Sequence, residues 1–360
     1  MPRQASNYGL ILAGGRGTRF WPRSRRARAK QVLRFVGDRS LIQQTVDRLS
    51  PVIPPNRIWV LTNEHLRAEI VRQLPKVPKA QILAEPAQRN TAPAIGLAAH
   101  ILQSIDPNAM MGVFSSDHVI SKPARYLSFV RGAFKAAAEG EMVVLGIQPR
   151  WSETGYGYIE FPKGVRAGSL QPLAVRKFRE KPDLPTAKRY VKSGNFYWNA
   201  GMFFWKTSVL LEALREFLPK TATLLASLPA FAGRGFSSQL KEAFPHCENI
   251  SIDYAVLEKA KSVVGFATDD FGWNDVGSWN ALYELLPRDG SANVVRGEAL
   301  AQASSGNYVD AEGKLVALLG VKDLVIVDTP DALLIADRSR AQEVGDVVKL
   351  LEKQRREDLL

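Results

Sequence analysis

The first half of the chain alternates short apolar runs with segments of helical periodicity. The apolar runs are rich in Val, Ile and Leu and predict strands over Tyr8–Ala13, Arg57–Leu61, Gln81–Ala84, Met110–Phe114 and Met142–Ile147. Between them, apolar residues recur every three or four positions and predict helices over Leu41–Leu49, Glu64–Leu74, Ala92–Ile105 and Ala124–Ala138. This alternation is typical of a parallel sheet covered on both faces, so we expect an α/β fold.

From about Ser291 the pattern changes to short β runs separated by Gly, Asp and Pro turns. Strands are predicted over Asn307–Val309, Leu315–Leu319, Leu324–Val327 and Ala332–Ile335, followed by a charged amphipathic helix over Ser339–Lys353. We therefore expect two domains: an α/β domain over residues 1–288 and a small β-rich domain with a helical tail over 289–360. The join is predicted near Pro287–Ser291.

Three polar loops follow predicted strands. They are the loop after Ala13, the Glu85–Thr91 loop and the Ser115–His118 loop. Because ligands of open α/β sheets bind at the carboxyl ends of the strands, we expect these loops to converge on one site.

The first of these loops is rich in glycine and arginine. Residues 14–19 read GGRGTR, and eight Lys or Arg residues lie between Arg16 and Arg34. Glycines let backbone N–H groups approach a ligand closely, and arginines supply forked donors for phosphate oxygens. The spacing fits neither the P-loop nor the dinucleotide fingerprint. The sequence therefore predicts a polyphosphate-binding loop of another type, although a structural turn would also explain the glycines.

Two aspartates could hold a metal ion. Asp117 follows an apolar strand, and Asp275 lies between Trp273 and Trp279. Magnesium often takes only one or two protein carboxylates and completes its shell with phosphates and water. A helix cap is the other interpretation of each aspartate. His118 has no second His or Cys at ligand spacing, so we interpret it as structural.

A third set of residues suits a hydroxyl-rich, phosphorylated ligand. Glu180 could accept hydrogen bonds from sugar hydroxyls, and Lys181 could neutralise a sugar phosphate, although a solvated charged turn is equally plausible. The segments Gly155–Tyr158 and Asn199–Gly201 add an amide and small residues, which would let a hydroxyl-rich ligand approach the backbone closely.

The composition limits the classes of binding partner that the chain is expected to have. The chain has 360 residues, is 46% hydrophobic and carries a net charge of +12, which favours anionic partners. Its basic excess lacks aromatic interleaving or a basic helix, so we disfavour nucleic acid. Cys247 is the only cysteine and is interpreted as a small buried residue. No apolar run approaches the ~18 residues of a membrane span, and no signal peptide is recognised, so we expect a cytoplasmic protein with no membrane partner.

Together, these segments resemble the sugar-1-phosphate nucleotidyltransferases, and most closely the bacterial mannose-1-phosphate guanylyltransferases. The shared motifs, in chain order, are LILAGGRGTRFWPRSR, AKQ, EPAQRNTAPAI, SSDH, GYGYIE, FREKP, WNAGMF, SIDYAVLEK, WNDVGSW and GVKDLVIVDTPDALLI. The resemblance covers nearly the whole chain. It implies the nucleotide-diphospho-sugar transferase fold, a Rossmann-like mixed and mainly parallel sheet, with a β-helix-like C-terminal domain.

The resemblance also implies residue roles. The nucleotide side would comprise Leu12, Ala13, Gly14, Gly15, Gly17, Thr18, Arg19, Lys30, Glu85, Asn90, Thr91 and Ser116. The sugar-phosphate side would comprise Tyr156, Gly157, Glu180, Lys181, Asn199 and Gly201. Asp117 and Asp275 would bind Mg²⁺, and both would act in catalysis with Arg19 and Lys30. Ala29 stands where the family commonly has Pro before the lysine, which leaves the loop around Lys30 less rigid.

The implied reaction joins GTP and mannose 1-phosphate to give GDP-mannose and pyrophosphate, with Mg²⁺ as cofactor. A different sugar or nucleotide, a catalytically silent regulatory homologue and a Rossmann oxidoreductase remain as alternatives; the missing third glycine disfavours the last. The chain ends at Leu360 without the isomerase module of some relatives, so we expect a single activity. A homodimer is possible. Arg23, Arg25, Arg26 and Arg28 are left without an assigned role.

Overall fold

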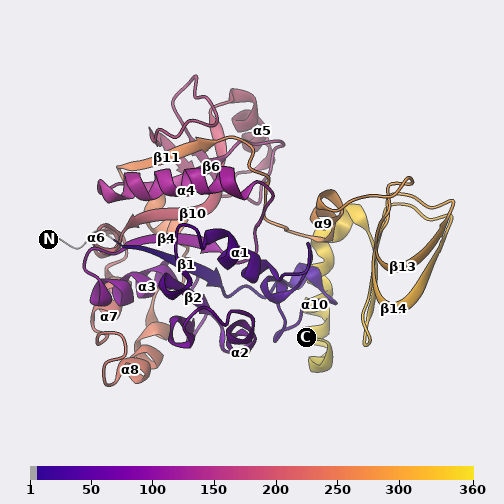
Figure 1. Ribbon diagram of the computed structural model, residues 1–360, viewed down its shortest axis with the longest axis horizontal. Helices are drawn as coiled ribbons and strands as arrows, with labels where there is room; N and C mark the ends of the chain where they lie inside the picture. Colours follow the sequence, from indigo (N-terminus) through magenta and orange to yellow (C-terminus); the bar gives the residue numbers. More distant parts are fainter. Residues whose placement is uncertain (1–5) are drawn as a thin grey trace.

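The computed structural model describes residues 6–360 and has a mixed, mainly parallel sheet at its centre (Figure 1). Within these residues, ten strands form this sheet, with a main order of β3-β2-β1-β4-β10-β6-β11-β8. The strands are β1 Asn7–Ala13, β2 Ile58–Thr62, β3 Ile82–Ala84, β4 Met110–Ser115, β6 Met142–Ile147, β7 Tyr158–Glu160, β8 Leu173–Ala174, β9 Lys177–Arg179, β10 Phe196–Lys206 and β11 Val263–Thr268. The α/β prediction is confirmed.

The direction of β10 makes the sheet mixed. Strands β1, β2, β3 and β4 are parallel to one another, and β6 is parallel to β11. The long strand β10 runs antiparallel between β4 and β6 and also pairs with β7. The carboxyl ends of β1, β3 and β4 therefore share one edge, so the three polar loops that follow these strands start from the same side of the sheet.

Helices cover both faces of the sheet (Figure 1). They are α1 Leu41–Leu49, α2 Glu64–Gln73, α3 Thr91–Ile105, α4 Pro123–Ala138, α5 Leu184–Ser193, α6 Thr207–Phe217, α7 Pro219–Ala226 and α8 Phe236–Ala243. A further helix, α9 Trp279–Leu285, packs instead against the C-terminal part of the chain. The predicted helices of the first half agree within one or two residues. Local capping explains the sharp start of α1, where Ser40 and Gln43 form a reciprocal capping box.

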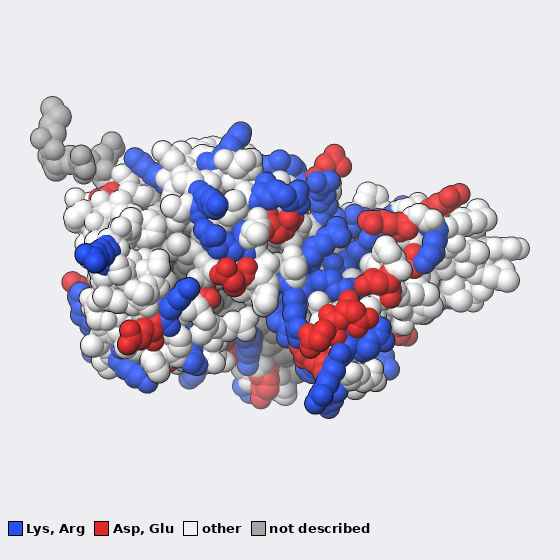
Figure 2. Space-filling model, turned by 90° about the horizontal axis from the view of Figure 1, so that it is seen from below, with Lys and Arg blue, Asp and Glu red and all other residues white. Residues whose placement is uncertain are grey.

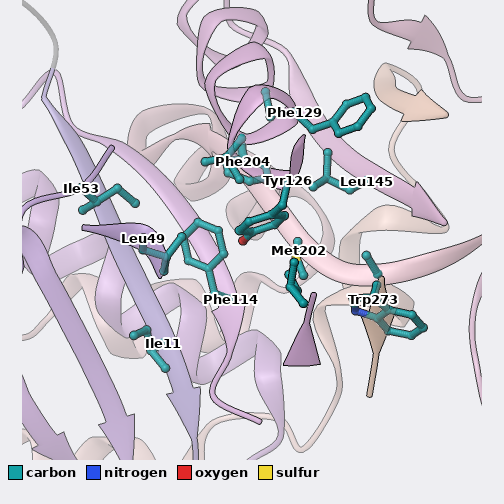
Figure 3. Packing of buried hydrophobic residues seen from close by; sticks show 14 of the residues in the cluster. Ile11, Leu49, Ile53, Phe114, Tyr126, Phe129, Leu145, Met202, Phe204 and Trp273 are labelled. Carbon is teal, nitrogen blue, oxygen red and sulfur yellow. The ribbon is translucent and has the colours of Figure 1, made fainter. Parts of the chain in front are cut away.

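The sheet is buried on both faces because side chains alternate along its central strands. Ile11 and Phe114 face one hydrophobic cluster, whereas their neighbours Leu10 and Val113 face another. Figure 3 shows the first cluster, in which Phe114 packs edge-on against Phe204 with ring centroids 5.5 Å apart. This rigid core fixes the strand ends that carry the site.

The C-terminal part is a separate four-stranded sheet with a helix beside it (Figure 1). Its strands are β13 Val294–Gln302, β14 Tyr308–Leu319, β15 Leu324–Asp328 and β16 Leu333–Asp337, and the chain then continues as α10 Val344–Lys353. Strands β13, β14 and β15 are mutually parallel, and β16 is antiparallel. Three details of the prediction were wrong. Strand β13 was not predicted, Asn307–Val309 and Leu315–Leu319 belong to one strand, and residues 338–343 are a 3₁₀ helix preceding α10.

Aromatic residues join the two parts. Trp279 packs between Phe20 and Tyr308, with ring centroids 5.1 and 5.5 Å away. Its indole N–H donates to the carbonyl of Trp21, whose own indole donates to the carbonyl of Leu359 at 2.9 Å. The segment after the glycine loop is therefore anchored in a core shared with the C-terminal domain.

The structure assigns roles to three of the four arginines that the sequence left open. Arg23 pairs with Asp310 at 2.5 Å and with Glu312 at 2.8 Å; Arg25 pairs with Asp331 at 3.0 Å; Arg26 pairs with Glu357. All four partners belong to the C-terminal part of the chain. Figure 2 shows blue and red side chains intermixed where the two parts meet. These arginines therefore connect the domains.

No helix formed by residues 6–360 combines the length and apolar character that a bilayer span needs. Cys247 is buried, which agrees with its interpretation as a small core residue.

Candidate active site

A cavity of about 560 Å³ lies at the carboxyl ends of β1, β3 and β4. Its walls include the residues Leu12, Gly14, Gly15, Gly17, Lys30, Gln31, Glu85, Gln88, Asn90, Thr91, Ser116, Asp117 and Asn249. The three predicted loops thus converge. Most of the residues proposed for the nucleotide line this cavity; Ala13, Thr18 and Arg19 do not. Ala13 is buried beneath the loop, and Thr18 lies beside Gly345.

Side chains behind the glycine loop hold its carbonyl groups. Gln31 donates to the carbonyls of Ala13 at 2.7 Å and Gly15 at 3.0 Å, and Asn63 donates to that of Gly14 at 3.3 Å. These bonds fix the loop with backbone alone on its cavity side. Gln31 was not among the predicted site residues, although it stands next to Lys30 in the AKQ motif.

Gly17 is required by its surroundings. Its φ is +63°, and a Cβ at this position would lie 2.5 Å from the Cβ of Lys30. The loop therefore packs directly onto the lysine, so the position of one depends on the other.

Lys30 connects the two aspartate segments. It is buried, and its Nζ donates to Oδ2 of Asp117 at 2.7 Å and to the backbone carbonyl of Asp275 at 2.6 Å. Burial alone would raise the pKa of Asp117, but the charge of Lys30 beside it outweighs burial and holds that pKa below its ordinary value. Asp117 is therefore ionised at neutral pH.

A short antiparallel pair places the aspartates together. Strand β5, Val119–Ile120, pairs with β12, Trp273–Asn274. Neither aspartate caps a helix, because the caps of α4 and α9 are Lys122 and Ser278. The capping interpretation is therefore wrong for both. The residue after Asp275, Val276, has φ +48°, an unusual backbone conformation for a β-branched residue.

His118 supports this strand pair and lines neither the first cavity nor the one on the other side of Asp275. Its Nδ1 accepts a hydrogen bond from the indole of Trp273 at 3.2 Å. Burial lowers the pKa of His118 to about 4, so the imidazole is neutral at physiological pH. The burial of His118 and its bond to Trp273 agree with a structural role.

The far end of the first cavity carries Glu85, Asn90 and Thr91. Burial raises the pKa of Glu85 to about 7. Asn90 has φ +64° and caps α3 through the backbone N–H of Thr91. The hydroxyl of Thr91 accepts from the N–H of Ile252 at 2.9 Å, which ties α3 to the segment that follows.

A second cavity of about 860 Å³ lies on the other side of Asp275. Arg19, Tyr156, Asp275, Gly277 and Gln342 help to line it. The hydroxyl of Tyr156 donates to Oδ1 of Asp275 at 2.6 Å, and burial and that carboxylate raise the pKa of the phenol. Arg19 lies in this cavity and not in the one with the glycine loop.

Beside Tyr156, the predicted sugar-phosphate residues form a compact carboxylate cluster. Glu180 is mostly buried, and its Oε2 has no hydrogen-bond partner among residues 6–360. Lys181 lies 3.3 Å from the other oxygen of Glu180. A Cβ on Gly157 would lie 2.4 Å from Glu180 Oε2 and 3.2 Å from Asn199 Cβ, so a larger residue here would displace the Glu180 carboxylate.

Asp253 completes this cluster and was missed by the sequence analysis. It accepts a hydrogen bond from the amide of Asn199 at 3.0 Å, and burial together with the charge of Glu180 raises its pKa to about 7. It begins a single π-helical turn, Asp253–Leu257. Such turns occur frequently at functional sites, but π-helical geometry leaves no clear sequence signal. Gly201 donates its N–H to Oδ1 of Asn199 at 3.1 Å.

A divalent metal would depend mainly on Asp117 and Asp275. Residues 6–360 contain no group of three or more His, Cys, Asp or Glu side chains placed to hold an ion. Two carboxylates, one of them partly exposed at the first cavity, fit the sparse protein shell of Mg²⁺, which takes its remaining ligands from phosphates and water.

Two family models match the chain. Residues 8–291 match the nucleotidyl transferase family, and residues 297–351 match the MannoseP isomerase/GMP-like beta-helix domain. The second match agrees with the observed β-rich C-terminal domain.

Curated relatives align along nearly the whole chain. A mannose-1-phosphate guanylyltransferase of Escherichia coli is 41% identical over 96% of this chain and 74% of its own length. The mannose-1-phosphate guanylyltransferase ManC of Salmonella typhimurium strain LT2 is 41% identical over 97% of this chain and 74% of its own. The xanthan biosynthesis protein XanB of Xanthomonas campestris is 42% identical over 95% and 73%.

Solved structures agree with these matches. A crystal structure described as mannose-1-phosphate geranyltransferase from Thermus thermophilus superposes with a TM-score of 0.84 and 34% identity, over 96% of this chain and 99% of that one. A mannose-6-phosphate isomerase from Helicobacter pylori gives a TM-score of 0.59 and 25% identity, over 75% and 99%.

Proposed function

Because this chain belongs to the nucleotidyl transferase family, we propose that it is a mannose-1-phosphate guanylyltransferase. It transfers GMP from GTP to α-D-mannose 1-phosphate and releases pyrophosphate, with GDP-mannose as the product. The observation that carries this proposal is that Lys30 joins a cavity suited to a nucleotide to Asp275. Asp275 in turn is hydrogen-bonded to Tyr156, which lies beside the carboxylate cluster suited to a sugar phosphate.

The first cavity has the features that GTP needs. Gly14, Gly15 and Gly17 present backbone to the triphosphate, and Lys30 lies at the inner end of that loop. Guanine offers N–H donors at N1 and N2, for which the Glu85 carboxylate is the acceptor. Asn90 and Thr91, at the start of α3, line the same cavity and would lie beside the guanosine.

The carboxylate cluster suits mannose 1-phosphate. Glu180 has a free acceptor atom for sugar hydroxyls, and Asn199 and Asp253 provide further polar atoms. Lys181 contributes positive charge for the phosphate, with Tyr156, Gly157 and Gly201 shaping the pocket.

The reaction is an in-line displacement at the α-phosphorus. A phosphate oxygen of the sugar attacks and pyrophosphate leaves, so one P–O bond forms and one breaks. The second pKa of a phosphomonoester is about 6, so the nucleophile is already ionised and no general base is needed. The protein therefore acts by positioning and by neutralising charge, with Lys30 nearest the centre and Arg19 on the Asp275 side.

Members of this family generally use a divalent metal, and we propose Mg²⁺ held by Asp117 and Asp275. When bound, the ion neutralises phosphate charge and aligns the two substrates. Lys30 keeps Asp117 ionised, and Tyr156 orients Asp275 by its hydrogen bond.

A substrate screen tests this function. Pyrophosphate release is measured with Mg²⁺ across ATP, CTP, GTP and UTP, each combined with mannose, glucose and galactose 1-phosphates. We expect the fastest turnover with GTP and mannose 1-phosphate. A preference for another pair would reassign the substrate within the family, and GTP binding without turnover under any pair would indicate a silent homologue.

A further inference from the structure

The C-terminal tail contacts the two arginines of the glycine loop, Arg16 and Arg19. Arg19 donates from Nη1 to the amide oxygen of Gln342 at 2.7 Å, although the two residues are 323 positions apart. Arg16 pairs with Glu352 at 2.7 Å. Gly345 lies close against the loop, since a Cβ there would be 3.4 Å from Thr18 Oγ1 and 3.7 Å from Arg19 Cγ.

The tail is fixed where it makes these contacts. Ala341, Val344 and Val348 are buried in the same hydrophobic cluster as Phe20 and Trp21. Gln342 therefore projects from a rigid segment, whereas Arg19 is a long, exposed side chain that would otherwise sample many rotamers.

The two contacts differ electrostatically. Glu352 is a carboxylate and neutralises Arg16, but Gln342 is uncharged and holds Arg19 while leaving its positive charge intact. That charge faces the second cavity beside Asp275, where Arg19 Nη1 would lie 3.5 Å from a Cβ on Gly277. A neutral acceptor is the appropriate partner for a cation that must still bind phosphate.

We propose that Gln342, supplied by the C-terminal domain, is a positioning residue that holds Arg19 beside Asp275 for the phosphates of the reaction. The proposal rests on the proposed function. It gives the β-rich domain and its tail a direct part in turnover, beyond the stability that their shared core with the catalytic domain provides.

A double-mutant cycle on the full chain tests this inference. Gln342→Ala should lower kcat about tenfold, the effect of losing one hydrogen bond to a charged group, with little change in Tm. In an Arg19→Ala background the same substitution should have no further effect, because Gln342 acts only through Arg19. Gln342→Glu should also lower kcat, since it keeps the contact but neutralises the guanidinium.

Arg340→Ala is the matched control. Arg340 lies on the same segment and pairs with the exposed Glu343, so its loss should leave kcat and KM unchanged. Wild-type kinetics in Gln342→Ala would overturn the proposal, as would an equal loss in the Arg19→Ala background.

Failure of the proposed function gives a different result. A wild-type chain that released no pyrophosphate would refute that function, and the Gln342–Arg19 cycle would then be measured by calorimetric binding of inorganic pyrophosphate. Coupling between the two residues would support the positioning role, and additive effects on affinity would contradict it.

Discussion

Lys30 is a buried cation whose amine contacts both aspartate segments at once. Removing it would delete the charge that we propose lies nearest the α-phosphorus and leave the half-buried Asp117 without its partner. We expect Lys30→Ala to lower kcat by about 10²–10³, the usual loss for one preorganised donor. Asp117→Asn should have a comparable effect. Steady-state pyrophosphate release measures both, and Lys76→Ala, an exposed lysine away from the cavity, should behave as wild type. Unchanged turnover in either site variant would remove Lys30 and Asp117 from the reacting centre.

If Glu85 recognises guanine as we propose, binding should depend on pH. Its pKa of about 7 lies above the ordinary value, so it is mostly protonated below pH 7 and ionised above it. Guanine needs the ionised form as acceptor, so affinity should rise with pH through 7. The affinity for GDP-mannose, whose phosphates do not titrate in this range, should be about tenfold weaker at pH 6 than at pH 8.

The variant Glu85→Gln isolates this carboxyl. It should bind GDP-mannose more weakly at pH 8 and lose the part of the pH dependence that Glu85 supplies. Calorimetry at a series of pH values measures both effects. A pH profile identical to wild type would show that Glu85 does not recognise the base in its ionised form.

Gly17 and Gly37 have similar positive φ angles but different surroundings. Comparing Ala substitutions at the two positions therefore separates backbone strain from steric contact with Lys30. Gly17 has φ +63° and Gly37 has φ +67°, but only Gly17 faces a close neighbour, since a Cβ there would lie 2.5 Å from Lys30; space is open around Gly37. Gly37→Ala should cost about 1–2 kcal/mol of stability, the penalty for a left-handed residue with a Cβ. Gly17→Ala should cost more and also reduce turnover, because the lysine must shift.

Urea unfolding and pyrophosphate release on the same samples measure this pair. If Gly17→Ala lost no more stability than Gly37→Ala and kept full activity, the loop would not set the position of Lys30.

The sequence predicted elements well where a local signal exists and poorly where it does not. Helix α1 was predicted with its exact ends because Ser40 caps it and its apolar stripe is regular. By contrast, β5 and β12 have two residues each, and their pairing depends on segments far apart in the chain. That pairing is what joins Asp117 to Asp275, so the sequence identified the two residues but gave no physical reason for their proximity.

At the scale of the whole molecule, the arginine-rich stretch connects the domains. The buried pair between Arg23 and Asp310 has side chains only 8% and 5% exposed. Breaking a buried pair typically costs ~3–5 kcal/mol. Because Asp310 would keep Arg296 as a partner at 3.3 Å, we expect the lower end of that range. Arg23→Ala should therefore strongly lower the urea midpoint, whereas Arg39→Ala, which removes an exposed pair with Asp47, should cost less than about 1 kcal/mol. Equal midpoints for the two variants would contradict this role.

The interdomain contacts could not be predicted from the sequence. A run of arginines after a phosphate loop is equally consistent with substrate steering, and the acidic partners lie about 290 to 330 residues further along the chain. Asp253 and Gln342 were missed for the same reason, since each gains its role from a partner distant in sequence. Site residues within the shared motifs were predicted because the family resemblance identified them.

Formation of GDP-mannose tests the proposed guanylyltransferase function most directly. The purified chain is incubated with GTP, mannose 1-phosphate and Mg²⁺, beside the Lys30→Ala variant, and the products are identified by mass spectrometry. We predict GDP-mannose and pyrophosphate in equal amounts from the wild-type chain and almost none from the variant. A folded wild-type chain that made no GDP-mannose, or a variant that made as much as the wild type, would contradict it.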